Sequence, residues 1–199
     1  RNQSAPVLVY SVDGQRVIQG SIITPRLAQM VRATDGIGDV GRINQGTFTV
    51  ATAAAERFDT TLLGYDDPDL GAPAELIDGE YPDAPGEAVG SDADADQGFG
   101  IGDTVSIEPG GFEVTIVGLA RDVQLNAVPT LFVQSDDYVA AVQSVNPDAT
   151  SVLPNVMAVS PADGVSDADS VERINAQSED LDALTKDAAK LLRHSGLNF

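Results

Sequence analysis

The sequence contains no cysteine and no tryptophan, and it has a single histidine, His194. The absence of cysteine excludes disulfides, thiolate nucleophiles and cysteine-ligated zinc. A multi-histidine metal site is excluded as well, and a Ser-His-Asp triad would depend on His194 alone. The spacing supplies no partner for that role. His194 follows Lys190 and Arg193, which favours a helix-terminal position where a cation suits the helix dipole.

Positively charged residues are scarce. The 199 residues include 11 Lys and Arg against 31 Asp and Glu, a formal net charge of -20 at pH 7. Phosphate groups are bound mainly by Lys and Arg, so this polyanion is repelled by nucleic acid and by anionic lipid surfaces. We therefore expect no nucleic-acid partner. Two explanations of the acidity stay open: adaptation to a salt-rich host, or a site for a cation or a basic partner.

Long apolar runs are also lacking. No stretch approaches the ~20 apolar residues that a membrane helix needs, and no signal peptide is visible. The chain starts at Arg1 rather than at methionine, so we expect a fragment whose flanking segments were removed. Hydrophobic residues still make up 42% of the chain, which is enough for a core in one domain or two small lobes.

The charges divide the chain into three parts. Between Arg57 and Arg121 there is no Lys or Arg, whereas fifteen Asp and Glu fall in this interval. The two flanks hold all eleven cations and sixteen acids, so they are nearer neutrality. This shift predicts a lobe of residues 63–135 inserted into a scaffold that residues 1–62 and 136–199 build together.

The first flank is predicted to fold as strand, helix and strand. Residues 7–10 form a β-rich apolar run. Thr24 and Pro25 are typical of the N-cap and first position of a helix, which we expect to end at Gly36. In residues 40–50, polar and apolar side chains alternate in part, as in an extended strand.

The last flank is predicted to repeat this order. Residues 152–159 are a strand candidate interrupted by Pro154. Asp169 and Glu172 match the N-cap and N3 positions of a capping box, which predicts that a helix begins there.

The end of the chain allows two interpretations. Residues 181–184 predict a short strand, with Thr185 capping a final helix that contains Leu191. The alternative is one broken helix over residues 170–193. With the strand, the flanks give two βαβ units, which predicts an α+β fold with a ferredoxin-like scaffold.

The middle segment is predicted to be a small β-rich lobe. Residues 104–107 and 112–117 flank a Glu-Pro-Gly-Gly turn, and their apolar side chains recur with a period of two, which predicts a hairpin. Residues 66–69 and 82–86 have turn-forming composition. Residues 129–133 predict a strand that returns the chain to the scaffold.

One acidic segment is similar to the start of a calcium loop. The carboxylates of Asp92, Asp94 and Asp96 alternate, and Asp103 falls at the twelfth position. The sixth position needs glycine for a sharp turn but holds Gln97. The twelfth residue is shorter than the glutamate required, and no amphipathic helix brackets the segment. A solvated acidic loop or a short helical turn is the better interpretation, and cation binding by the three carboxylates stays open.

No other motif indicates a catalyst. Residues 98–102 are glycine-rich, but they lack the spacing of a phosphate-binding loop and do not open onto a helix. Almost any two of the 31 acids could form a glycosidase-like pair, so abundance alone identifies none. We therefore predict no catalytic, cofactor-binding or metal-binding residues, and no enzyme.

Four sequence phrases occur together in a familiar order: LIDGEYP at 76–82, APGEAV at 84–89, IGDTV at 101–105 and FEVTIVG at 112–118. In this order, the chain resembles the extracytoplasmic domain of FtsX/MacB-type ABC transporter permeases over about residues 5–195. The family patterns are a G-x-x-P followed by PGE, a GDTV, and an F-x-V-x-x-VG hairpin. The departures are the acidity of the insert and the residues at 92–96.

The resemblance implies a two-lobed domain between two membrane helices, with a porter-like lobe built from both ends and a sabre-like β-rich insert. It also implies a non-catalytic part at the extracytoplasmic face of the cell membrane. There the domain would relay motion from its own membrane helices, driven by a separate cytoplasmic ATPase subunit, to a cargo or protein outside. A second permease copy is implied in the full transporter. The alternatives are a freestanding secreted acidic module that binds calcium or a basic protein, and a hydrolase with a carboxylate pair.

Overall fold

The computed structural model describes residues 5–121 and 127–188, which form an α+β fold, as predicted. The strands of the described part are β1 (Val7–Ser11), β2 (Ile37–Ala51), β3 (Arg57–Tyr65), β4 (Leu76–Gly79), β5 (Glu87–Ser91), β6 (Thr104–Glu108), β7 (Phe112–Ala120), β8 (Thr130–Gln134), β9 (Val156–Pro161) and β10 (Leu181–Thr185). Its α-helices are α1 (Pro25–Arg32), α2 (Pro68–Gly71), α3 (Ser135–Val145) and α4 (Asp167–Asn175).

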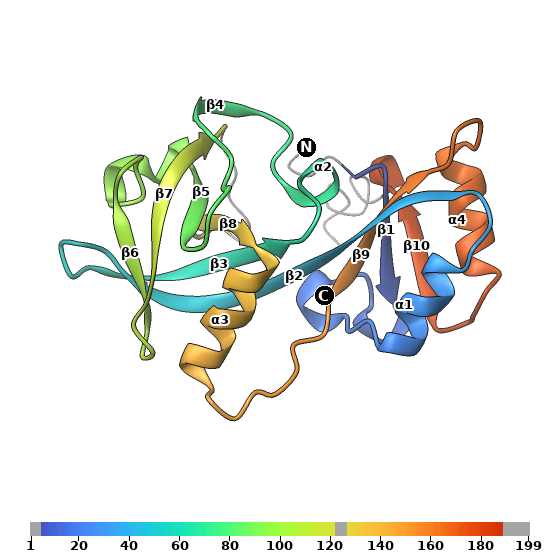
Figure 1. Cartoon of the computed structure of the whole chain (residues 1–199), viewed down its shortest axis with the longest axis horizontal. Helices are drawn as coiled ribbons and strands as arrows, with labels where there is room; N and C mark the ends of the chain where they lie inside the picture. The colour runs from blue at the N-terminus through green and yellow to red at the C-terminus, as the bar shows by residue number, and fades with distance from the viewer. Residues whose placement is uncertain (1–4, 122–126, 189–199) are drawn as a thin grey trace.

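Two groups of elements lie side by side, and the long strand β2 runs from one group into the other (Figure 1). We call the first group the α/β lobe: β1, α1, the first half of β2, β9, α4 and β10. We call the second group the barrel lobe: the second half of β2, β3, β5 to β8, and α3. Strand pairing is continuous from β10 at one end of the sheet to β4 at the other. The lobes therefore share β2, and the predicted boundaries of 63–135 within 1–62 and 136–199 stay a prediction.

The α/β lobe contains both predicted βαβ units. Its strands lie in the order β10-β1-β9-β2, and every neighbouring pair is antiparallel. Helix α1 connects β1 to β2, and α4 connects β9 to β10. The α+β class is thus confirmed, while the description as ferredoxin-like stays a prediction.

The two helices of this lobe test the capping predictions. Thr24 is the N-cap of α1, and its hydroxyl accepts a hydrogen bond from the Leu27 N–H at 3.3 Å, as expected. The predicted start of α4 at Asp169 is wrong. The N-cap is Ser166, whose hydroxyl accepts the Asp169 N–H at 3.1 Å, so the helix begins three residues earlier. Ser166 and Asp169 themselves have the spacing of a capping box, which explains the earlier start.

Strand β9 begins after Pro154 rather than at residue 152. Proline cannot donate to a strand ladder. Instead, the Pro154 carbonyl accepts the Ile23 N–H at 2.7 Å, which fastens the segment before β9 to the α/β lobe.

The strand interpretation of residues 181–184 is confirmed, because β10 pairs with β1 along its whole length. The Thr185 hydroxyl accepts the Ala188 N–H at 3.2 Å, as expected for a cap. The rest of the predicted final helix, with Leu191 and Leu192, and His194 lie outside the described residues.

The barrel lobe is a closed ring of strands. Pairing runs from β2 to β3, β8, β5, β7 and β6, and β6 pairs again with β2. The predicted hairpin is β6 and β7, with Ile107 opposite Phe112. Closure of a ring leaves few exposed strand edges. Phe99, from the segment before β6, packs in one core with side chains of the ring strands: Val50, Leu62, Ala88, Val105, Ile107, Val114, Ile116, Leu131 and Val133.

Helix α3 has no counterpart among the predictions. Tyr138 and Ala141 are buried against the barrel, and Val142 packs beside them. The spacing of these side chains, continued by Val145, is that of one helix face. The apolar spacing after Ser135 was a signal in the sequence from which the helix could have been predicted.

The edge of the sheet at β10 is covered by a side chain. The Asn175 carboxamide oxygen accepts the Ala183 N–H at 2.7 Å, and its nitrogen donates to the Ala183 carbonyl at 3.3 Å. One amide from α4 thus occupies both backbone groups that Ala183 directs away from β1.

Candidate functional site: the junction between the lobes

The junction begins with a strand that belongs to both lobes. From Ile37 to Ile43, β2 pairs with β9 of the α/β lobe, and from Ile43 to Ala51 it pairs with β3 of the barrel. The same backbone thus forms ladders with strands of both lobes. Strand β2 therefore connects the two lobes through one continuous backbone segment that is hydrogen-bonded to both.

A hydrophobic core continues across this connection. It combines side chains of β1 and β9 with side chains of the barrel and of α2: Leu8, Tyr10, Ile43, Leu63, Tyr65, Leu70, Val89, Ala120, Phe132, Val156 and Ala158. Burial raises the pKa of Tyr65 to about 12, with a smaller effect from nearby Tyr81. The tyrosine is therefore neutral throughout the physiological range. Shared apolar packing of this kind opposes separation of the lobes.

An ion pair joins β2 to the residue that follows β3. The Arg42 Nε of β2 lies 2.8 Å from the Asp66 Oδ2, just after β3. The other carboxylate oxygen accepts the Arg42 backbone N–H at 2.7 Å. Asp66 thus binds both the backbone and the side chain of one residue, which fixes the chain where β2 leaves the α/β lobe.

Asn155 ties three separate segments together. Its carboxamide oxygen accepts the Gln45 N–H at 2.9 Å, and its nitrogen donates to the Ser21 carbonyl at 2.9 Å. Its own backbone N–H donates to the Ile43 carbonyl at 2.9 Å. The returning chain before β9 is thereby held against the midpoint of β2 and against the segment before α1.

Tyr138 of α3 packs directly on the junction strands. An ideal Cβ on Gly64 of β3 would lie 2.6 Å from the Tyr138 Cβ, and one on Gly46 of β2 would lie 2.6 Å from the Tyr138 hydroxyl. Its ring meets Phe48 edge to face, with ring centroids 5.9 Å apart. Burial raises the pKa of Tyr138 to about 12. The two glycines allow α3 to approach the strands closely.

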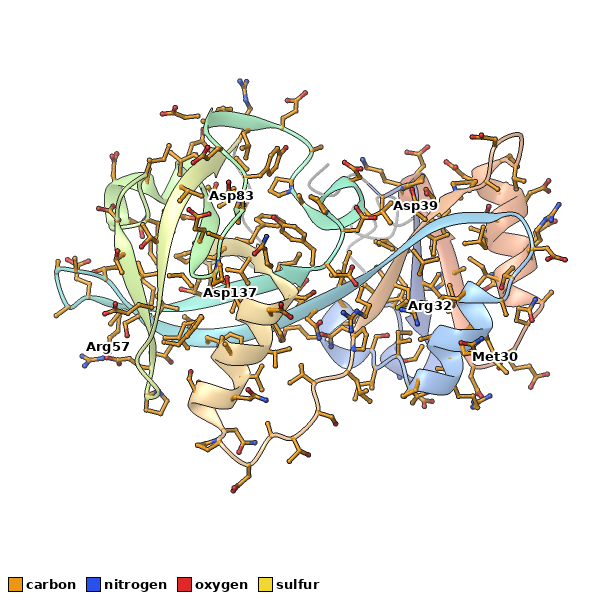
Figure 2. All side chains as sticks on the ribbon, in the orientation of Figure 1. Met30, Arg32, Asp39, Arg57, Asp83 and Asp137 are labelled. Carbon is orange, nitrogen blue, oxygen red and sulfur yellow. The ribbon has the colours of Figure 1, made fainter. Side chains whose placement is uncertain are left out.

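Carboxylates hold the loop before β5 against the start of α3. The buried Asp137 accepts the Gly86 N–H at 2.9 Å, and Glu87 accepts the N–H groups of Asp83 and Ala84 at 3.0 and 2.9 Å. Figure 2 places Asp83 and Asp137 in the barrel lobe, at the loop and at α3. Burial raises the pKa of Asp137. A hydrogen bond to Glu87 raises the pKa of Asp83, whereas backbone N–H groups lower that of Glu87.

The structure does not gather the acidic segment into a metal site. Asp92, Asp94 and Asp96 lie in a 3-10 helix, Asp92–Gln97, with Asp94 buried and Asp92 exposed. Asp103 instead binds the Gly100 N–H at 2.9 Å. Over residues 5–121 and 127–188, no group of three or more Asp, Glu, His or Cys side chains could hold a metal ion. The segment is a short helical turn, as the better interpretation of the sequence predicted.

None of the helices in the described residues is both long and apolar enough to cross a bilayer. Neither a protein-family model nor a curated protein matches the sequence.

The fold is that of the extracytoplasmic domains of MacB-type ABC transporter permeases. The periplasmic region of MacB from Actinobacillus actinomycetemcomitans is similar with a TM-score of 0.65 and 12% identity, over 98% of this chain and 95% of that one. The extracellular domain of the ABC-type transporter YknZ from Gram-positive bacteria is similar with a TM-score of 0.58 and 13% identity, over 90% and 99%. The predicted resemblance is therefore confirmed at the level of the fold, and each neighbour is matched as a whole domain.

Proposed function

We propose that this chain is the non-catalytic extracytoplasmic domain of an ABC transporter permease. The observation that carries the proposal is the whole-length similarity to two such domains, which extends over both lobes. The proposal locates the chain at the extracytoplasmic face of the cell membrane, attached to its own membrane helices. Its other partners are a separate cytoplasmic ATPase subunit and a second permease copy.

The proposed role is mechanical. ATP hydrolysis on the cytoplasmic subunit shifts the membrane helices, and this domain transmits the shift to a cargo or protein outside. The junction supports this role, because β2 is common to both lobes and is fastened by Arg42, Asp66 and Asn155. A displacement of the α/β lobe is passed on to the barrel through this strand and the shared core.

The matched pair of substitutions for testing the relay is Asp66→Ala and Glu108→Ala. Asp66 pairs with Arg42 across the junction at 2.8 Å, whereas Glu108 pairs with Arg57 inside the barrel lobe at 2.7 Å. Both acceptors belong to partly exposed ion pairs, which contribute little to stability. Asp66 also accepts the Arg42 backbone N–H at 2.7 Å, so urea unfolding of both variants is measured beside transport, which separates a loss of stability from an effect of position.

The experiment uses the complete permease reconstituted with its ATPase in vesicles, and it measures transport and ATP hydrolysis together. Asp66→Ala is expected to lower transport per ATP hydrolysed, because the junction yields, while Glu108→Ala leaves the ratio unchanged. Equal ratios in wild type and both variants would refute the relay. A complete reading frame without apolar segments of ~20 residues on each side of the domain would refute the permease assignment itself.

A further inference from the structure

Two exposed isoleucines lie in and near the edge strand β4. Ile77 in β4 is 41% exposed, and Ile101, in the turn before β6, is 44% exposed. The Ile101 Cδ1 lies 2.9 Å from the position that a Cβ on Gly79 would occupy. Gly79 follows Ile77 by two residues on β4, whose register against β7 shifts at Ile77, so the Ile101 side chain reaches β4 two residues from Ile77. We call Ile77, Gly79 and Ile101 the β4 patch.

The rim of the β4 patch is acidic. Glu75, Asp78 and Glu80 are exposed on either side of Ile77, and Asp103 follows Ile101 by two residues. No Lys or Arg occurs in residues 58–120. Ala120, the last residue of β7, pairs with Leu76 at the start of β4. The nearest cation along the chain is the next residue, Arg121. The patch thus combines exposed aliphatic surface with an excess of negative charge.

Backbone pairing is not the recognition mode that this surface offers. β4 is the last strand of the sheet and only four residues long. The Asp78 carboxylate accepts the Gly79 N–H at 2.8 Å, so a donor of the strand is already used. Short edges with charged residues resist added strands. A partner would therefore contact the side chains of the patch.

The charge decides which partner fits. A second copy of this chain carries the same net charge of -20 and is repelled. Anionic lipid is repelled for the same reason. A segment with both aliphatic and basic side chains can cover the isoleucines and pair with the carboxylates around them, which gives attraction over a distance and specificity on contact.

We propose that the β4 patch is the docking surface for a cationic, aliphatic segment of an extracytoplasmic partner protein. The proposal deepens the proposed function, because it names the chemistry of the partner to which motion is relayed. Its test measures binding rather than transport. A negative result would leave the permease assignment intact, and a failure of the relay would leave this binding intact.

The probe is a short peptide of alternating Lys and Leu, titrated into the 199-residue chain by calorimetry at moderate salt. Two control peptides alternate Lys with Ser and Glu with Leu. The Lys-Leu peptide is expected to bind, and Ile77→Ser with Ile101→Ser is expected to weaken it about tenfold, which corresponds to about 1.4 kcal/mol. Glu75→Gln with Glu80→Gln is expected to weaken it and to reduce its salt dependence.

The matched control is Val12→Ser with Val17→Ser, two aliphatic residues of the α/β lobe that are 47% and 46% exposed. This variant is expected to bind the peptide as the wild type does. Circular dichroism confirms that each variant is folded, so a loss of binding is not a loss of structure. Equal binding of the Lys-Ser peptide, or equal losses in both pairs of variants, would overturn the proposal, because attraction to the acidic surface as a whole would then explain the data.

Discussion

The packing of α3 on the junction predicts a large effect for a very small substitution, Gly64→Ala. The added methyl carbon would lie 2.6 Å from the Tyr138 Cβ and 3.0 Å from its Cγ. Both atoms are close to the α3 backbone, so a rotation of the side chain does not remove the clash. Tyr138 is also enclosed by Phe48 and Gly46. The helix as a whole must move away from β3.

Overpacking of this kind costs about 1–3 kcal/mol. For a chain of this size, each kcal/mol lowers the melting temperature by about 2–4 °C. Urea unfolding followed by circular dichroism measures the change in the free energy of unfolding. The control is Gly20→Ala, because the nearest atom to an added Cβ there is 3.4 Å away. If the two variants were equally stable, α3 would not pack on β3 as described.

Two further predictions concern charge. The raised pKa of Asp137 means that the folded state binds this proton more tightly than the unfolded state. Its stabilising contribution is therefore fully present below the ordinary carboxyl pKa of about 3.9 and is lost as the pH rises through the raised value. Asp137→Asn keeps an acceptor for the Gly86 N–H and should make stability less dependent on pH in this range, whereas Asp137→Ala should cost about 1–3 kcal/mol. Unfolding in urea at a series of pH values tests both variants. Parallel profiles of stability against pH for wild type and Asp137→Asn would contradict the raised pKa of Asp137. The net charge of -20 predicts a melting temperature that rises between about 0.1 M and about 1 M salt, since screening weakens the repulsion within the chain. A melting temperature independent of salt would show that this repulsion does not limit stability.

Local features of the fold were predictable because their causes lie close together in the sequence. Thr24 followed by Pro25 set the start of α1, and the alternation around the Glu-Pro-Gly-Gly turn set the hairpin of β6 and β7. The start of α4 was misplaced because two overlapping capping patterns compete, and Ser166 rather than Asp169 provides the cap. In each case the deciding contacts span three or four residues.

The junction was not predictable in this way. Asn155 and Gln45 are 110 residues apart, and Arg42 and Asp66 are 24 apart. Periodicity predicted β2 as an extended segment, but it carried no information on which half pairs with which lobe. The charge pattern predicted two lobes, yet it could not reveal that they share β2, because pairing depends on contacts distant in sequence. The sequence likewise showed the acidic composition around β4, but it could not predict that Ile101 lies beside Gly79, because these residues are also distant in sequence.

The side-chain amide of Asn175 has a consequence for association with other molecules through the β10 edge. A foreign strand that approached β10 would find the Ala183 donor and acceptor already engaged. To pair with Ala183 it would have to break two hydrogen bonds and displace Asn175. The uncharged Asn175 side chain thereby opposes the addition of a neighbouring molecule's strand at the middle of β10.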